Sequence, residues 1–422
     1  MSKQQASINP AGGAGAGAAP PGAGAGAVAY SPEVLQRLVD QAAYFNVFSL
    51  PDAKTSDVAI RGQGSNGDLV GFRVCEDLRR FAVTVLPPTA DGGLKASNVV
   101  GDSYGEFTHR WVLAPDDFVA LPGREPPPTR LDPSRSQRFV MLDSVCTFGG
   151  SRNGFRGFGA GKTFPVTIDG RTQLLAATVG TILEGFGAFK DHEQGTYLHC
   201  GSLSPECGFA GNMLLRVMDS QGTLRAGGRL PPPKARPLPE PDITYIIFRG
   251  QAVESDPVTP RVGADGQLKG LTVVQGLRLI SLSSDSSKGD GPRSLARVGQ
   301  VIGKITAHVD FNPAYPGGTA LNPIPFTTFD ELNFTDEAGR DIGGFTGDSS
   351  EGRVFNIKIA GQGGIRFGGV GQILNGTGPF QGMSGLMTDN SVVIFTPHVS
   401  ASLYVLRVYD PDGRFRSAVN GD

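Results

Sequence analysis

The chain has 422 residues with 38 basic and 40 acidic side chains, and this near balance excludes a strong field that would attract nucleic acid or an anionic membrane. No run of about 18 or more apolar residues is present, so we expect no membrane-spanning helix. The length is too great for one ordinary core and predicts two domains. The 61 glycines and 31 prolines are typical of many short strands joined by tight turns, which predicts an all-β protein.

The N-terminal segment predicts a tail followed by a short helix. Residues 1–29 are rich in Gly, Ala and Pro, and we expect a disordered tail because they offer little apolar surface to bury. They also lack the apolar stretch of a secretory signal, which predicts a cytoplasmic protein. Ser31 as N-cap, Pro32 at the first position and Glu33 in the first turn predict a helix that runs to Phe45. We expect this helix to cover one face or one open end of the first domain, with docking to a partner as the alternative.

From residue 47 onwards the sequence favours β-strands. Nine short segments are rich in β-branched or aromatic residues and are bounded by Gly, Pro, Asn or Asp. They are 80–87, 139–145, 163–168, 211–219, 244–250, 276–282, 354–361, 391–397 and 402–410. The segments 219–222 and 410–413 both have Asp first and Gly fourth, which predicts a type I turn that closes a hairpin.

The chain contains an internal duplication. Residues 179–226 align without a gap on 370–417 at a shift of 191, with 14 of the 48 positions identical. A second block, 69–81, aligns on 268–280 at a shift of 199. A repeat of this length is a whole domain and not a solenoid unit. We therefore expect two related domains that form an internal pseudodimer.

A proline-rich segment separates the two copies. Six prolines lie within residues 229–241, and such a segment favours an extended, stiff spacer. The predicted organisation is a disordered tail (1–29), a first β-barrel domain with its N-terminal helix (30–228), a linker (229–242) and a second β-barrel domain (243–422).

A glycine-spaced hairpin in each copy is the reason for predicting barrels. In the second copy Gly376 and Gly378 allow a tight reversal, Phe380 sends a large apolar side chain inward, and Gly382 and Gly385 leave room for a bend. This spacing suits a small, strongly coiled barrel.

The hairpin resembles the Gly-Thr-Gly-x-Phe-x-Gly-x-x-Gly signature of the allene oxide cyclase and dirigent barrel superfamily. The match covers about 25 residues of the second copy, whereas the first copy keeps Gly185, Gly187 and Phe189. The resemblance implies two tandem, antiparallel, calycin-like barrels of eight strands each. The acidic-plus-Asn motif of plant allene oxide cyclases is not found on a matching first strand, and the nearest such segment, 330–333, lies farther along the repeat.

Three side chains are candidates for acid–base chemistry. His109 and His308 fall on each other at the shift of 199, and two equivalent imidazoles could act near neutral pH, although their neighbours differ and coincidence is the alternative. Glu184 lies at the mouth of the glycine hairpin, where the second copy has Asn375. It is either a catalytic carboxylate among apolar neighbours or a solvated turn residue. His199 is expected in a loop or at a strand end.

Further residues are candidates for contact with a substrate. Arg216 and Arg407 match in the repeat, and each lies in its domain's last strand. On an inner face they would bind a carboxylate or enolate, whereas on an outer face they would be solvated or form an interdomain ion pair. Asn375 and Phe380 are the other predicted contacts.

The sequence offers no motif for a metal or a cofactor. No His, Cys, Asp and Glu cluster has metal-ligand spacing and no Gly-x-Ser-x-Gly elbow is present, so we expect neither a metal nor a cofactor. Cys200 and Cys207 are either bridged or buried thiols.

The predicted function is that of a cofactor-independent cyclase, isomerase or lyase. Its substrate would be a hydrophobic small molecule, such as a polyketide, terpenoid or oxylipin-like intermediate, held in one barrel while the other serves as scaffold or lid. The alternative is a non-catalytic small-molecule-binding or structural and assembly barrel protein. Either function allows a homo-oligomer, and the sequence does not decide the oligomeric state. An interior cavity with a polar group favours the enzyme, and a barrel filled by side chains favours the structural protein.

Overall fold

A computed structural model describes residues 31–35, 42–51, 58–61, 69–81, 100–218 and 242–420. Short gaps within the last two ranges fall at 128, 149–151, 169, 191–194, 205–207, 253–257, 285–296, 298, 312–314, 316, 320, 360 and 395–398. The predicted tail 1–29, the linker before Asp242 and Cys207 lie outside the described residues. Within these residues the structure is almost entirely antiparallel β-sheet, so the predicted all-β class is confirmed. No described helix is long and apolar enough to cross a membrane.

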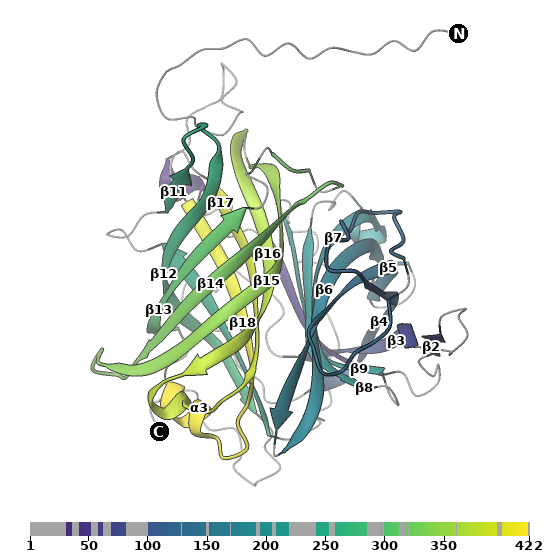
Figure 1. The fold of residues 1–422 in the computed structure, drawn as a ribbon. Coiled ribbons are helices and arrows are strands. Elements are labelled where there is room, and N and C mark those ends of the chain that lie inside the picture. Colours follow the sequence, from purple (N-terminus) through teal and green to yellow (C-terminus); the bar gives the residue numbers. More distant parts are fainter. Residues whose placement is uncertain are drawn as a thin grey trace.

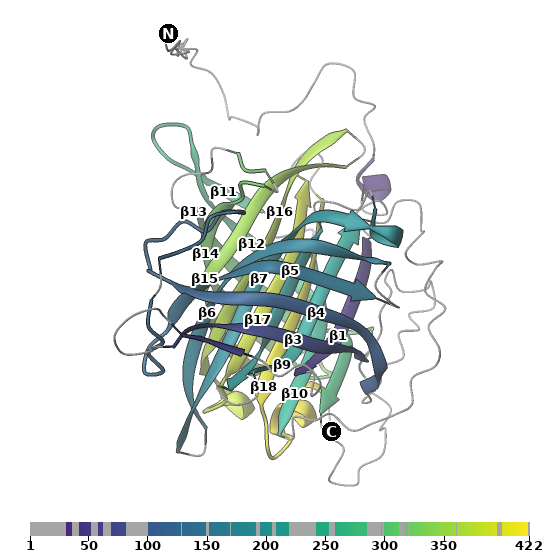
Figure 2. The same cartoon turned by 90° about the vertical axis from the view of Figure 1, so that its right-hand side faces the viewer.

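Barrel 1 is the name used here for the first sheet, which contains nine strands within the described residues. They are β1 (Ala42–Pro51), β2 (Val58–Arg61), β3 (Leu69–Phe81), β4 (Val100–Ala114), β5 (Gln137–Phe148), β6 (Gly154–Ile168), β7 (Arg171–Phe186), β8 (Thr196–Ser204) and β9 (Gly208–Met218). Each consecutive pair from β3 to β9 is antiparallel, and β1 pairs with both β9 and β3. Eight strands therefore close into a barrel, and β2 pairs with the first residues of β3, on the edge where β1 pairs farther along. Figure 2 shows β3, β4 and β5 side by side on the face of barrel 1 that is turned to the viewer.

Barrel 2, the second sheet, repeats this topology. Its strands are β10 (Ile243–Ala252), β11 (Thr259–Val262), β12 (Leu268–Ser284), β13 (Val301–Phe311), β14 (Ile324–Thr335), β15 (Asp341–Ile359), β16 (Gln362–Gly376), β17 (Gly385–Ile394) and β18 (Val399–Tyr409). The pairing of β10 with both β18 and β12 closes this barrel, and β11 lies beside β12. Figure 1 shows the two barrels side by side.

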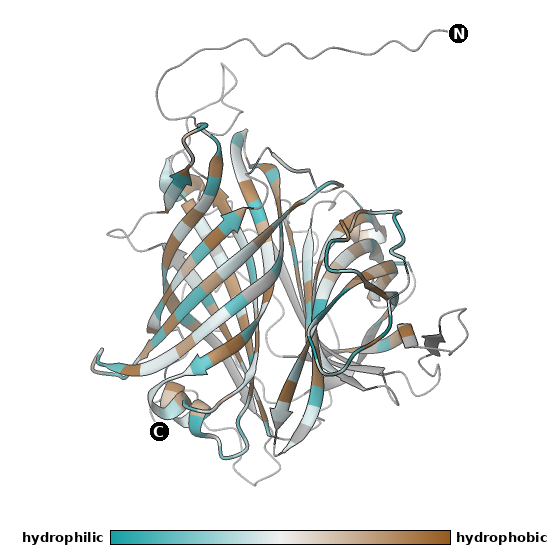
Figure 3. Ribbon diagram, viewed as in Figure 1, coloured by the Kyte–Doolittle hydropathy of each residue, from teal (hydrophilic) through white to brown (hydrophobic). Residues whose placement is uncertain are grey.

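Alternation of side chains along each strand builds the cores. In β14 every second residue from Ile324 to Phe334 is buried, and the residues between them are exposed or half-buried. The alternation of hydrophobic and hydrophilic bands is visible on the strands of barrel 2 (Figure 3). Because successive side chains of a strand point to opposite faces, one face fills the barrel and the other faces outward.

The two barrels pack through their outer faces. In β18 the inward residues Tyr404, Leu406 and Val408 belong to the interior core, whereas Leu403 and Val405 belong to the core between the barrels. Strands β6, β7 and β8 supply the barrel 1 side of that core. The buried residues that form it are Phe164, Val166, Leu175, Ala177, Val179, Leu198, Cys200, Ile243, Tyr245, Ile247, Val370, Leu386, Leu403 and Val405.

The N-terminal helix begins where predicted, but it ends earlier and packs elsewhere. Ser31 caps it, because its Oγ accepts a hydrogen bond from the Val34 N–H at 3.4 Å. The predicted continuation to Phe45 is wrong, because β1 begins at Ala42 and residues 42–45 therefore belong to the sheet. Leu35 is fully buried against the outer face of barrel 2, so the expected position on the first domain is also wrong.

The glycine hairpin confirms the inward position of its phenylalanine. Gly378 has φ +60°, and a Cβ atom on Gly376 would lie 1.9 Å from the Phe380 carbonyl oxygen. The reversal then forms the 3₁₀ turn Gly378–Phe380 and buries the Phe380 ring completely, 5.0 Å from the ring of Phe345. Phe189 is buried in the same way in barrel 1, at the end of the turn Gly187–Phe189. The inward phenylalanine and one glycine at positive φ, Gly187 or Gly378, are therefore found in both copies, whereas the positive φ expected at Gly376 is not observed.

The turn at Asp410 leads into a helix and not into a hairpin. The Gly413 N–H donates to the Asp410 carbonyl at 3.0 Å, as a type I turn requires. The chain continues as α3 (Arg414–Asn420), whose Phe415 N–H donates to Asp410 Oδ1 at 3.0 Å. At 410–413 the predicted turn is confirmed, and the predicted strand return is wrong because the Asp410 carboxylate caps a helix instead. The turn predicted at 219–222 lies outside the described residues.

The strand register corrects the gap-free alignment. Opposite residues in β8 and β9 include His199 and Met213, whereas Asp389 and Tyr404 are opposite in β17 and β18. Equivalent residues of the two barrels are therefore 389 − 199 = 190 positions apart between β8 and β17, and 404 − 213 = 191 positions apart between β9 and β18. A slip of one residue exchanges the two faces of a strand, so the structural counterpart of His199 is Asp389.

Candidate functional site

Each barrel has a layer of polar side chains in its interior, and the pairing of strands shows that the two layers lie at equivalent positions. Val74 lies opposite His109 in barrel 1, and Val273 lies opposite Ala307 in barrel 2. The shift is 199 for β3 and 198 for β4, so His109 corresponds to Ala307 and not to His308. The predicted equivalence of the two histidines is wrong for this reason. His308 lies on the outer face, 3.4 Å from the Thr272 hydroxyl.

Three strands of barrel 1 bring Glu76, His109 and His199 together inside the barrel. Their side chains are 0%, 3% and 0% exposed, and the atoms that each could offer to a metal ion lie within 4.8 Å of one another. His199 Nε2 lies 3.3 Å from Glu76 Oε2. The expected position of His199 in a loop or at a strand end is wrong, because it lies in the middle of β8.

Aromatic rings surround this cluster. The His109 ring lies 4.6 Å from Phe107 and 5.7 Å from Trp111, measured between ring centroids, and it meets the His199 ring edge-on at 5.9 Å. Burial lowers the pKa of His109 well below its usual value, with a further contribution from His199. Burial also lowers the pKa of His199 to about 3. Both imidazoles are therefore neutral at pH 7, and each has one N–H group and one nitrogen with a free lone pair.

Barrel 2 has two carboxyl groups at this level. Asp330 on β14 is 4% exposed and accepts a hydrogen bond from the Thr328 hydroxyl at 2.8 Å. Asp389 on β17 accepts one from the Ser391 hydroxyl and keeps part of its area exposed. Burial raises the pKa of Asp330 to about 7, and burial together with the nearby charge of Asp330 raises the pKa of Asp389 to about 8. Both groups can therefore exchange protons near neutral pH.

A tyrosine and a glutamine complete the layer in barrel 2. The Tyr404 hydroxyl donates to Gln275 Oε1 at 2.8 Å, and its ring stacks on Phe248 with 5.2 Å between centroids. Burial raises the pKa of Tyr404 well above its usual value, and Asp389 and Asp330 add to the shift. Tyr404 therefore stays protonated and can donate a hydrogen bond.

The repeated arginines lie outside the barrels, in the interface between them. Arg216 Nη1 donates to the Asn390 carbonyl of barrel 2 at 3.1 Å, and Arg407 Nη2 donates to the Ser202 hydroxyl of barrel 1 at 2.8 Å. The alternative in which these side chains point into a barrel and hold a substrate is wrong, because both belong to outer faces. Their reciprocal contacts fit an internal pseudodimer. The pKa of Asp389 is raised mainly by burial, and the charge of Arg216 across the barrel wall offsets a small part of that rise.

The remaining predicted site residues lie away from the polar layers. Glu184 is 67% exposed and pairs with Arg156 at 3.5 Å, which matches the solvated alternative. Asn375 is exposed, and its side-chain amide donates to the Thr346 hydroxyl at 3.4 Å. Phe380 is part of the apolar core at one end of barrel 2. The structure therefore does not bring these three residues together with either histidine.

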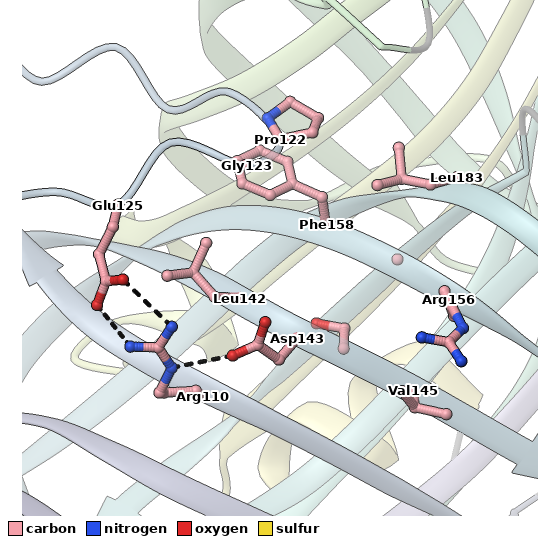
Figure 4. Close-up of a pocket in the computed structure, with 12 residues that line it drawn as sticks. Arg110, Pro122, Gly123, Glu125, Leu142, Asp143, Val145, Arg156, Phe158 and Leu183 are labelled. Carbon is pink, nitrogen blue, oxygen red and sulfur yellow. Dashed lines mark hydrogen bonds and ion pairs between the residues drawn. The ribbon is translucent and has the colours of Figure 1, made fainter.

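A pocket of about 410 Å³ lies on the outer face of barrel 1 (Figure 4). Arg110 lies at its edge and donates to Glu125 at 2.5 Å and to Asp143 at 3.1 Å, so one positive charge is shared between two carboxylates. Asp143 has φ +54° in a bulge of β5. Because this pocket is lined by outward side chains, it is separate from the two interior layers.

No protein-family model, curated protein or solved structure matches the chain. The resemblance to the allene oxide cyclase and dirigent superfamily therefore remains an expectation from the glycine hairpin.

Sequence reasoning missed Glu76, Asp389 and the interior position of His199. Glu76 and His109 are 33 residues apart in the sequence, and His199 is a further 90 residues away, so no local spacing relates them. The alternation of inward and outward side chains along a strand could have identified Glu76 as an interior residue. Glu76 continues the inward series of Val74 and Leu78, and a charged residue in such a series marks the barrel interior.

Proposed function

We propose that this protein is an enzyme that acts on a hydrophobic small molecule inside barrel 2, with Asp330 and Asp389 as its acid–base pair. The observation that carries the proposal is the pair of interior carboxyl groups with pKa values of about 7 and about 8. General acids and bases work best when their pKa lies near the working pH, and two coupled carboxyl groups divide the roles of acid and base.

The surroundings suit an apolar ligand. Asp330 lies opposite Ala307 on β13 and opposite Gly347 on β15, so the smallest side chains flank it on both sides. In barrel 1 the position of Ala307 is occupied by the His109 ring. Apolar residues of two core clusters lie above and below the layer, including Phe326 and Phe334 on the same strand. The partly exposed Asp389 is consistent with space beside it.

The chemistry would be a proton transfer at each of two positions of one bound molecule. The protonated carboxyl group donates its proton to one atom while the ionised carboxylate takes a proton from another, so no electrons are gained or lost. Tyr404 would stabilise a developing oxyanion by turning its one hydroxyl proton from Gln275 Oε1 to that oxygen. Isomerisation, cyclisation and elimination are the reactions that such a pair supports.

Two measurements test this function. Native and then denaturing mass spectrometry of the purified chain looks for a small apolar compound that is released on unfolding. Fluorescence of 1-anilinonaphthalene-8-sulfonate then reports an apolar site in solution. Ala307→Trp should abolish the fluorescence increase because the indole would fill the space beside Asp330. His308→Trp is the matched control, since the next residue points outward.

The two carboxyl groups are tested with any compound that is released. Asp330→Asn and Asp389→Asn should each bind the compound yet fail to convert it, and loss of conversion by a factor of about 10² or more is expected for a general acid or base. Equal probe fluorescence in the wild type and Ala307→Trp, with no released compound, would refute the enzyme. Together with a discrete oligomer mass, that result would favour the structural or assembly protein instead.

A further inference from the structure

We propose that barrel 1 holds one divalent transition-metal ion, bound by Glu76, His109 and His199. The three residues come from β3, β4 and β8, and the barrel wall brings their side chains to one point in its interior. Two imidazoles and one carboxylate are a common set of protein ligands for zinc and for related first-row metals.

The geometry is close to that of a metal site. The 3.3 Å between His199 Nε2 and Glu76 Oε2 agrees with the roughly 3.5 Å that separates two ligand atoms of a tetrahedral zinc ion bound at about 2.0–2.2 Å. The full cluster spans up to 4.8 Å, so a small rotation of the His109 ring would bring its nitrogen into range.

The unsatisfied imidazole of His109 points to a missing ligand. Both of its ring nitrogens are buried, and neither has a hydrogen-bond partner among the residues that the structure describes. A neutral imidazole has one N–H donor and one lone-pair acceptor, and leaving such groups buried without partners costs stability. A metal ion on the lone pair would satisfy the acceptor and hold the ring in place.

The charges also favour a cation. Glu76 is fully buried, and a bound cation would offset the charge of its carboxylate in that setting.

Barrel 2 serves as an internal negative control. The corresponding positions are Gln275, Ala307 and Asp389, so only one of the three has a side chain that commonly binds a transition metal. The structure therefore predicts one metal ion per chain and not two. This site lies in the other barrel from the proposed acid–base pair, so each proposal can fail without the other.

The test is the zinc content of the full-length chain without an affinity tag. The chain is stripped with a chelator, loaded with zinc chloride, separated by gel filtration and measured by inductively coupled plasma mass spectrometry. We expect about one zinc per chain in the wild type, since the three side chains together form a single site. His109→Ala and His199→Ala should lose this zinc, whereas the outward-facing His308→Ala should keep it.

A second measurement covers variants that fail to fold. Cobalt(II) added to the wild-type chain should give visible d–d absorption bands of a low-coordinate site, and zinc should displace them. Zinc should also raise the unfolding temperature of the wild type, because a ligand that binds only the folded state stabilises it. A folded wild type without bound zinc and without cobalt bands would overturn the proposal. Unchanged zinc content in folded His109→Ala and His199→Ala would overturn it as well.

Discussion

Asp330→Asn should stabilise barrel 2, and the gain should grow with pH. In the unfolded chain the carboxyl group ionises near its ordinary pKa of 3.8, whereas burial raises the pKa to about 7 in the folded protein. Between these values the folded state holds one proton that the unfolded state has released. The free energy of unfolding of the wild type therefore falls as the pH rises from 4 to 7, and the loss is complete above pH 7.

The size of the effect follows from the two pKa values. Their difference is 7 − 3.8 = 3.2, and at 1.36 kcal/mol for each pKa unit it corresponds to about 4 kcal/mol. Asparagine does not ionise, and its side-chain oxygen can still accept the hydrogen bond from Thr328. The variant should therefore match the wild type near pH 4 and exceed its free energy of unfolding by about 4 kcal/mol above pH 7.

Urea unfolding followed by circular dichroism at a series of pH values from about 4 to 9 measures this difference. Asp310→Asn is the matched control, because Asp310 lies on the outer face of the neighbouring strand β13 with a side chain that is 59% exposed. Its substitution should change the free energy of unfolding by only about 0.5 kcal/mol at any pH. A constant difference between Asp330→Asn and the wild type across this range would refute the argument that Asp330 ionises within the barrel.

Three further substitutions test the packing. Phe380→Ala should lower the free energy of unfolding, measured with urea, by about 3–5 kcal/mol because the ring is fully buried. The control Leu374→Ala, at an exposed position, should lower it by less than about 1 kcal/mol. Equal losses in the two variants would contradict the burial of Phe380. Gly378→Ala should lower the midpoint temperature of thermal unfolding, because φ is +60° and the new Cβ would lie 2.3 Å from the Ile342 carbonyl oxygen. An unchanged midpoint would contradict the backbone conformation of the turn Gly378–Phe380. Arg407→Leu should cost about 1–3 kcal/mol through the bond lost to Ser202, yet leave binding of the fluorescent probe unchanged. Loss of probe binding would place this arginine inside the barrel.

The sequence alone was sufficient for the class of fold and for several local features. The duplication, the alternating strands and the glycine hairpin depend on residues near one another in the chain or on a comparison of the chain with itself. Ser31 as a cap, Gly378 at a positive φ and Phe380 in the core were therefore predictable. Each follows from a local steric or hydrogen-bonding requirement that does not depend on the rest of the fold.

The register between strands was not available from the alignment. A shift of 199 pairs His109 with His308, and the structure pairs it with Ala307 because β4 and β13 are offset by 198. The period of a strand is two residues, so an error of one residue places a side chain outside the barrel instead of inside it. Cross-strand hydrogen bonds and core packing set this register, and neither is visible in a comparison of two sequences.

Both candidate sites depend on closure of the barrels. Residues such as Glu76 and His199 become neighbours only when β3 and β8 face each other across the interior. The strands alone determine which residues point inward, and the closed tertiary structure determines which inward residues meet. Burial at that point then changes the chemistry, since the same carboxyl group that ionises freely in solution holds its proton near neutral pH inside the barrel.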